Sequence, residues 1–179
     1  MPSAASSELT ERTAAIEVRF CSRVLDEGCL DESVLDARFT ELLPRLGREY
    51  TQPGAVRVLV DGVTRFNGDD ELAFLTGALC FAGVTALANG EAIETLYSTS
   101  SVRWRATPMD SDIELEDGFG GRLRVGRVTL LPLLYSCGLR TLAHLQRVAA
   151  HQADLAAQLP YLERDAAAAK SALVAHRLA

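Results

Sequence analysis

Aromatic residues are scarce in this 179-residue chain, at 6% of the sequence, although apolar residues together make up 48%. Leu, Val and Ala must therefore supply most of any hydrophobic core. A chain of this length corresponds to one domain, and a domain of this size buries roughly 70% of the surface of its unfolded chain. The composition thus predicts a globular protein with an aliphatic core.

An excess of positive charge is also lacking, because the formal net charge is −6 and the isoelectric point is about 5.1. Proteins that bind the phosphate backbone of nucleic acids need a basic face. Anionic lipid surfaces likewise attract basic segments. The charge balance disfavours nucleic-acid and membrane partners, and it is compatible with another protein, for example a basic one, as the partner.

The four cysteines form no CxxC pair, and no Cys/His spacing resembles a zinc site. The first seventeen residues are polar and charged and lack the apolar segment of a secretion signal. We therefore expect a cytoplasmic protein with reduced thiols. Two of the cysteines, Cys80 and Cys137, lie in apolar surroundings, where a thiol behaves as a small hydrophobic group.

A membrane-spanning segment of about 20 apolar residues is missing as well. The longest candidate, LAFLTGALCFAGVTALA at residues 72–88, has seventeen uncharged residues and is rich in Ala and Gly. Its flanks are acidic or polar and lack the Lys and Arg residues that anchor membrane helices. The segment predicts a helix covered on most sides at the centre of the fold, with Gly77 and Gly83 allowing close packing.

Apolar residues in the first 50 positions recur at helical spacing. Ile16, Phe20 and Val24 predict a helix over residues 8–27, after a disordered N-terminus at residues 1–7. A second helix is expected from Asp31, with a kink at Pro44. Its apolar stripe consists of Leu35, Phe39, Leu42 and Leu46. These two helices are expected to form a helical hairpin.

The middle of the chain alternates with the period of β-strands. Residues 56–60 and 63–66 predict a hairpin around Asp61-Gly62, a sequence typical of tight hairpin turns, and residues 67–71 should begin the buried helix. Three further strands are expected within residues 101–107, 112–117 and 122–128. An acidic strand there lies between two strands that each carry two arginines, so the charges predict ion pairs across the sheet.

Two C-terminal helices complete the predicted fold. The first should start at Pro132 and run to Leu159, and Pro160 should separate it from the second. An Ala-rich seam suits contact with another helix of this chain or of a partner: Leu142, Leu145, Ala149, Ala156 and Leu159. The expected class is α+β, with an antiparallel sheet (hairpin plus three-strand meander) packed against the buried central helix. We expect one domain at residues 8–159 with an appended helix at residues 160–179.

No catalytic, metal-binding or cofactor-binding constellation is evident. His144 and His151 lie seven residues apart on one predicted helix, too far apart for one metal ion, and both are expected to be exposed. No serine lies in a GxSxG motif, and the glycines of DGFGG lie between two strands, as in a hairpin turn. The acidic residues at 110–117 lack the spacing of an EF-hand loop.

Two functional hypotheses remain. The first is a non-enzymatic protein-binding module, such as an adaptor, chaperone or immunity-like protein, that acts through an acidic surface or the Ala-rich seam, with a homo-oligomer as one variant. The second is a small-molecule-binding protein or an enzyme of unfamiliar type. Its pocket would lie between the sheet and the 72–88 helix, near Trp104, Tyr97 and Cys80.

Overall fold

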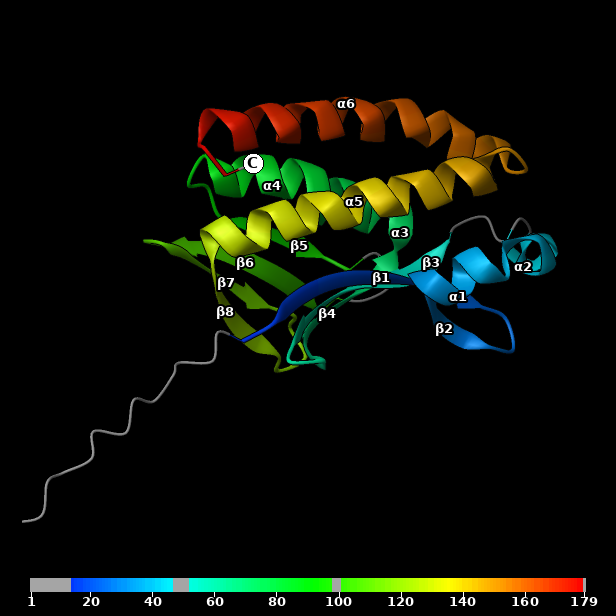
Figure 1. Ribbon diagram of the computed structural model, residues 1–179, viewed down its shortest axis with the longest axis horizontal. Helices are drawn as coiled ribbons and strands as arrows, with labels where there is room; N and C mark the ends of the chain where they lie inside the picture. The colour runs from blue at the N-terminus through cyan, green and yellow to red at the C-terminus, as the bar shows by residue number, and fades with distance from the viewer. Residues whose placement is uncertain (1–13, 47–51, 98–100, 179) are drawn as a thin grey trace, which may run out of the picture.

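Two antiparallel four-stranded sheets lie below a layer of helices (Figure 1). The computed structural model describes residues 14–46, 52–97 and 101–178. The first sheet has the order β2 (Gly28–Asp31), β1 (Ile16–Val24), β3 (Pro53–Val60) and β4 (Val63–Glu71). The second has the order β5 (Ile93–Leu96), β6 (Arg103–Met109), β7 (Asp112–Glu116) and β8 (Arg122–Gly126). This architecture confirms the predicted α+β class.

The helices form three groups. Short helices α1 (Glu32–Ala37) and α2 (Phe39–Leu46) follow β2 beside the first sheet. A continuous central segment consists of α3 (Leu72–Leu75), the π-helix η1 (Thr76–Phe81) and α4 (Ala82–Ala88). Two long helices follow, α5 (Arg127–Ala149) and α6 (Ala153–Ala175). Helix α5 packs on β1 of the first sheet and on β7 and β8 of the second, and α6 lies along α5 and α4.

The segment at residues 72–88 is confirmed as a helix at the centre of the core. Its large apolar side chains are fully buried: Leu72, Leu75, Leu79, Phe81 and Leu87. Helix α5 approaches this segment closely at Gly138, where an added Cβ would lie 2.7 Å from the Cβ of Cys80. Gly77 faces α6, and an added Cβ there would lie 3.3 Å from Cδ2 of Leu162.

Helix α5 is, among the described residues, long and apolar enough to cross a membrane. Half of its most apolar part is buried inside the fold. Because α5 packs on both sheets and on α6, its composition is that of a core helix.

The expected N-terminal helix is wrong for residues 16–24, which form strand β1 between β2 and β3. The apolar residues at positions 16, 20 and 24 are four apart, and a spacing of four fits both the helical period and the strand period of two. The intervening residues decide between them, since buried Val18 and Phe20 alternate with Glu17 and Arg19. The predicted helical hairpin is therefore replaced by the β1–β2 hairpin followed by α1 and α2. Residues 1–13, including the predicted disordered terminus, lie outside the described residues.

The second expected helix is present in two parts. The helix breaks at Arg38, between α1 and α2, and Pro44 lies inside α2 without breaking it. Leu35, Leu42 and Leu46 are buried and Phe39 is partly buried, as the stripe predicted.

The predicted hairpin and the predicted three-strand meander are both present, but they belong to two sheets rather than to one: β1 and β2 extend the hairpin, and β5 extends the meander. Asp61 and Gly62 have φ angles of 49° and 77°, as a two-residue turn with two positive φ angles requires. Strand β4 continues to Glu71, so residues 67–71 do not begin the helix; they pair with β3 as far as Pro53. In the second sheet the acidic strand β7 lies between two arginine-bearing strands, with Glu116 opposite Arg105 on one side and Arg122 on the other.

The C-terminal helices have different boundaries from those predicted. Helix α5 begins at Arg127 rather than Pro132 and ends at Ala149, and α6 contains Pro160. Pro160 lies on the exposed side of α6, and the helix continues through it. The chain turns instead at residues 150–152. The predicted seam is largely used inside the chain: Leu142, Leu145 and Ala149 are buried, Leu159 is partly buried and Ala156 is exposed.

Candidate functional site

His144 on α5 is buried, with only 2% of its surface exposed, so the prediction of an exposed histidine is wrong. That prediction assumed one narrow buried stripe on the helix. Helix α5 is covered on two sides, by α6 and by the first sheet with α1 and α2, and its buried surface is correspondingly wider. Thr141 is buried for the same reason, and its hydroxyl donates to the carbonyl of Cys137.

The imidazole of His144 lies among aromatic rings. Its centroid is 5.6 Å from that of Phe20 and 6.0 Å from that of Phe39, which meets it edge-on. Burial lowers the pKa of His144 to about 4; the positive charge of Arg147 acts in the same direction, and Asp36 opposes both. The ring is therefore neutral at neutral pH, with one N–H donor and one nitrogen acceptor. Among the described residues, neither ring nitrogen has a hydrogen-bond partner.

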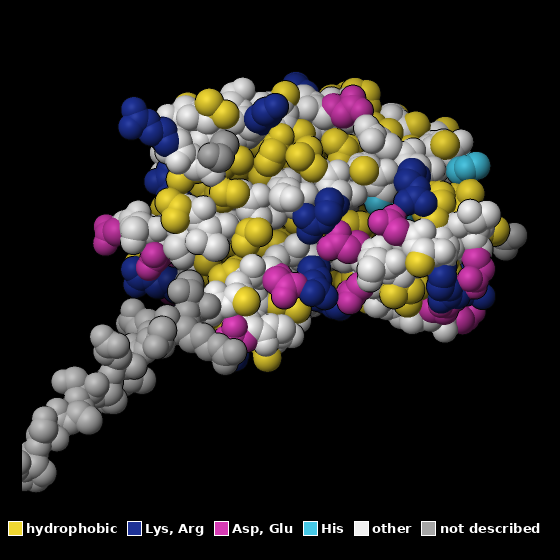
Figure 2. All heavy atoms as spheres, viewed as in Figure 1, with side chains coloured by type: hydrophobic (Ala, Val, Ile, Leu, Met, Phe, Trp, Pro, Cys, Tyr) yellow, Lys and Arg dark blue, Asp and Glu magenta, His cyan; other side chains and the backbone are white. Residues whose placement is uncertain are grey.

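His144 forms the floor of a hollow of about 250 Å³ between α1, β1 and α5, which we call the α1–α5 cleft. Figure 2 shows acidic and basic side chains together on this face of the molecule, over α5 and α1. The cleft is lined by Phe20, Glu32, Asp36, Arg140, Ala143, His144 and Arg147.

Two ion pairs bound the α1–α5 cleft. Nε of Arg140 donates to Oε2 of Glu32 over 2.7 Å, and Nη1 of Arg147 donates to Oδ1 of Asp36 over 2.6 Å. The two acids lie one turn apart on α1, and the two arginines lie two turns apart on α5. Both ion pairs thus connect the same two helices, and His144 lies between them in the α5 sequence.

The two arginines differ in how firmly they are held. Arg140 also donates through Nη2 to the carbonyl of Val18 (2.8 Å) and through Nη1 to Oγ of Ser136 (3.0 Å). The hydrogen bond to Glu32 raises the pKa of Arg140 above its ordinary value. Arg147 instead stacks on Phe39, with its guanidinium carbon 3.7 Å from the ring centroid. Arg140 is consequently held by several partners at the wall of the cleft. Arg147 forms one ion pair within the described part of the chain, and its side chain is 42% exposed.

The residues expected to form a pocket, Trp104, Tyr97 and Cys80, are all buried in the hydrophobic core. The Tyr97 hydroxyl lies 3.0 Å from the carbonyl of Asp117 and donates to it, and burial raises the pKa of Tyr97. Cys80 faces α5, where a hydrogen bond with Cys137, together with burial, raises its thiol pKa. Tyr97 and Cys80 thus make their contacts at different elements, and a ligand pocket beside them stays a prediction.

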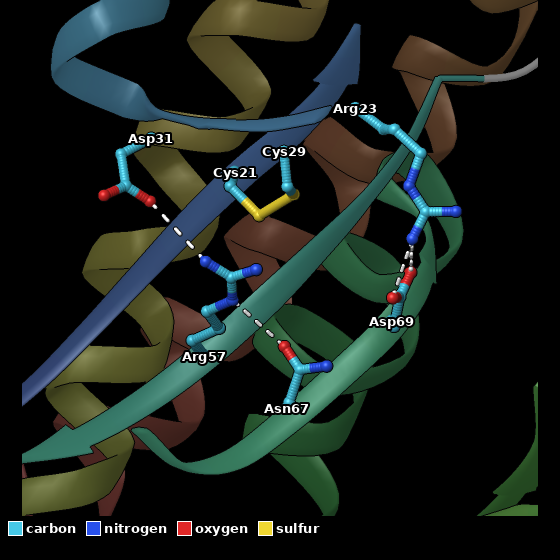
Figure 3. The surroundings of a disulfide bond; sticks show 7 residues. All are labelled: Cys21, Arg23, Cys29, Asp31, Arg57, Asn67 and Asp69. Carbon is cyan, nitrogen blue, oxygen red and sulfur yellow. Dashed lines mark hydrogen bonds and ion pairs between the residues drawn. A yellow bond between two sulfur atoms is a disulfide. The ribbon is translucent and has the colours of Figure 1, made fainter. Parts of the chain in front are cut away.

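The expectation of four reduced cysteines is wrong for Cys21 and Cys29, which form a disulfide between β1 and β2. Figure 3 shows this bond on the first sheet, with charged side chains on both sides of it. Arg23 is paired with Asp69, and Nε of Arg57 donates to Oδ1 of Asn67 over 3.0 Å. Reading residues 16–31 as a hairpin, rather than as a helix, would have placed these two cysteines on neighbouring strands, where Cys29 pairs with Arg23 and Cys21 with Asp31. Cys80 and Cys137 are free and buried, as predicted.

A metal centre is not found within residues 14–46, 52–97 and 101–178, where no three His, Cys, Asp or Glu side chains are grouped to bind an ion. A second hollow, of about 320 Å³, lies between α4 and α6 and is lined mainly by small residues with Glu91 and Asp165. The residues of the α1–α5 cleft come from distant parts of the sequence, and no motif connects them.

Comparison with known proteins does not identify a relative. No family model matches the chain, and neither the curated proteins nor the solved structures contain a match. The feature that bears on function is therefore the geometry of the α1–α5 cleft.

Proposed function

We propose that this chain is a non-enzymatic binding protein whose ligand occupies the α1–α5 cleft. The observation that supports this most strongly is His144, which is buried although neither ring nitrogen has a partner among the described residues. A buried polar group without a partner costs about 1–3 kcal/mol. Both nitrogens are shielded from solvent, so a ligand reaches them only when side chains around the ring shift; a hydrogen bond formed in that way would remove the cost and favour binding at this position.

The chemistry of the cleft supports binding over catalysis. A histidine with a pKa of about 4 is a weak base at neutral pH. A nucleophile–base pair requires a serine, threonine or cysteine within hydrogen-bond distance of the imidazole, and no such bond to His144 exists in the described parts of the chain. The volume of about 250 Å³ is slightly below the ~300–1,000 Å³ typical of pockets for drug-sized ligands. The cleft therefore suits one small molecule.

The first test is a metabolite panel screened by thermal shift, with His144→Phe as the informative variant. Phenylalanine keeps an aromatic ring beside Phe20 and Phe39 but removes both ring nitrogens. Compounds that raise the melting temperature of the wild type should raise that of His144→Phe much less. His151→Phe, which alters an exposed histidine, is the matched control and should respond like the wild type. Equal stabilisation of His144→Phe and wild type by every hit would contradict binding at the cleft.

Protein binding, the first hypothesis from the sequence, remains a second candidate. Its support is two large apolar side chains of α6, Tyr161 and Val174, which are 61% and 60% exposed. Large exposed apolar side chains of this kind are enriched where proteins contact one another. For the homo-oligomer variant, light scattering should give twice the monomer mass for the wild type and the monomer mass for Tyr161→Asp. A monomeric wild type at high concentration would contradict that variant.

A further inference from the structure

We infer that the ligand of the α1–α5 cleft is a small zwitterion, namely a free amino acid with one ammonium and one carboxylate group. This inference rests on the proposed function, since it names the class of ligand that the same cleft would bind. It follows from the charges that surround the cleft, from the donors and acceptors they offer, and from its volume.

The charges around the cleft are balanced. Arg140 and Arg147 supply two positive charges, and Glu32 and Asp36 supply two negative charges. A simple anion that approached the arginines would also meet the carboxylates on α1, and a simple cation would meet the arginines. Like-charge contacts of this kind are the usual means by which a site rejects the wrong ligand. A molecule with both charges a few ångströms apart meets both groups favourably.

Arg147 is the residue that would hold the carboxylate. Its Nη1 donates one hydrogen bond to Asp36. Because a guanidinium carries five N–H donors in a planar fork that matches a carboxylate, further donors remain for a ligand. The ring of Phe39 below it, at 3.7 Å, fixes the plane of that fork. Arg140 is less suited, because Glu32, Ser136 and the Val18 carbonyl already take most of its donors.

The ammonium group would lie between α1 and His144. An ammonium has three N–H donors and no acceptor, so it needs several acceptors around it. Asp36, whose side chain is 67% exposed, and Glu32, one turn away, provide carboxylate oxygens. The neutral imidazole of His144 has a nitrogen acceptor that is unpartnered among the described residues; this atom is shielded from solvent, so it accepts from the ammonium only after the side chains around the ring shift.

The remaining surface sets the size of the ligand side chain. Phe20 supplies an apolar wall, and Ala143 lies between the two arginines in the α5 sequence at an exposed position. With about 250 Å³ in total, the cleft suits an amino acid whose side chain is apolar and of small or medium size.

The test uses L-leucine as the probe and two capped forms as matched controls, with the full chain at pH 7. N-acetyl-L-leucine lacks the ammonium charge, and L-leucinamide lacks the carboxylate. Binding is followed by the NMR signals of the His144 ring nitrogens during titration. We expect L-leucine to shift these signals and each capped form to bind roughly tenfold more weakly or worse, as expected when a charged hydrogen-bonding partner is removed.

A pair of variants tests the assigned residue. Arg147→Gln should weaken the binding of L-leucine by roughly tenfold or more. Arg45→Gln, which removes the ion pair between Arg45 of α2 and Glu27 in the turn between β1 and β2, is the matched control and should bind L-leucine like the wild type. Thermal melting of both variants verifies that they are folded.

Two results would overturn the inference. Capped forms that bind as well as L-leucine would show that the cleft does not select a zwitterion. A His144 ring that responds to none of L-leucine, glycine and L-phenylalanine at millimolar concentration would do the same. In the second case, a response to another compound of the metabolite panel would retain the proposed binding function, whereas no response to any compound would overturn both.

Discussion

Among single residues, His144 couples the stability of the fold to pH. An unfolded histidine has a pKa of about 6.5, and burial lowers the pKa of His144 to about 4. At pH values between about 4 and 6.5, this histidine is protonated in the unfolded chain and neutral in the folded protein. The free energy of unfolding therefore rises with pH from about 4 to 6.5 and is fully present above 6.5.

We predict that lowering the pH from 6.5 to 4.5 reduces the free energy of unfolding of the wild type by about 2 kcal/mol through this residue. Urea denaturation at several pH values measures it. In His144→Phe this part of the pH dependence should disappear, whereas exposed His151→Phe should retain it. Identical pH profiles for wild type and His144→Phe would show that the histidine is not held neutral. The neighbouring carboxylates of Glu32 and Asp36 are common to all three proteins, so the comparison isolates the imidazole.

Glycine also acts at the scale of one residue, where α5 crosses η1. A Cβ at position 138 would lie 2.7 Å from both the Cβ of Cys80 and the ring of Phe81. We predict that Gly138→Ala destabilises the protein by about 1–3 kcal/mol, the usual cost of overpacking a core. Gly77→Ala is the control: its Cβ would meet only the movable end of Leu162 at 3.3 Å, so its melting temperature should stay close to that of the wild type. If Gly138→Ala melts like Gly77→Ala, the helices are farther apart than described. The larger change Gly77→Leu is still expected to disrupt the packing of α6.

At the scale of elements, the disulfide fixes β2 to β1. The bond closes a loop with a sequence separation of 8, which corresponds to roughly 2–3 kcal/mol of stabilisation in the chain-entropy account. We predict that the double variant Cys21→Ala/Cys29→Ala loses about that much free energy of unfolding. Reductant should destabilise the wild type and leave the double variant unchanged. A wild type that is insensitive to reductant in urea denaturation would contradict the prediction.

Some elements of secondary structure could be predicted from the sequence, and others could not. The β3–β4 turn was predictable because Asp61-Gly62 has a strong local preference. The strands β6 to β8 were predictable because charged and apolar residues alternate along each of them. A shift of the pairing by one residue would place the charges against the core. Strand β1 was not, because a spacing of four residues between Ile16, Phe20 and Val24 satisfies both a helix and a strand. The sequence does not predict the end of α5, because Pro160 is the stronger helix-breaking signal, yet the chain turns at residues 150–152 and α6 continues through Pro160.

The α1–α5 cleft could not be predicted from sequence for a different reason. Its lining residues come from position 20, from α1 and from α5, with separations of up to 127 residues between Phe20 and Arg147. Local periodicity contains no information on contacts across such distances. The sequence predicts a helix where strand β1 lies, and this error also changes the predicted surroundings of His144. The site therefore could not be recognised from the sequence.

At the scale of the whole molecule, α6 is expected to be necessary for the fold. It buries Leu155, Leu162 and Leu173 against α5, α4 and η1, and each buried leucine contributes about 1.5–3 kcal/mol. We predict that a chain ending at Gln152 no longer unfolds cooperatively in a thermal melt followed by circular dichroism. Cooperative melting of that shortened chain would instead support a C-terminal helix that is appended to an independent domain.

The long contacts of α5 also have a consequence for synthesis. Arg140 donates to the carbonyl of Val18, 122 residues earlier in the chain. A ribosome adds about 5–20 residues per second, so β1 emerges roughly 6–25 seconds before the helix that covers it. During that interval α1, α2 and α3 can pack on the first sheet, but the part of β1 that α5 covers stays uncovered. The speed of translation between β1 and the end of α5 should therefore affect the yield of folded protein.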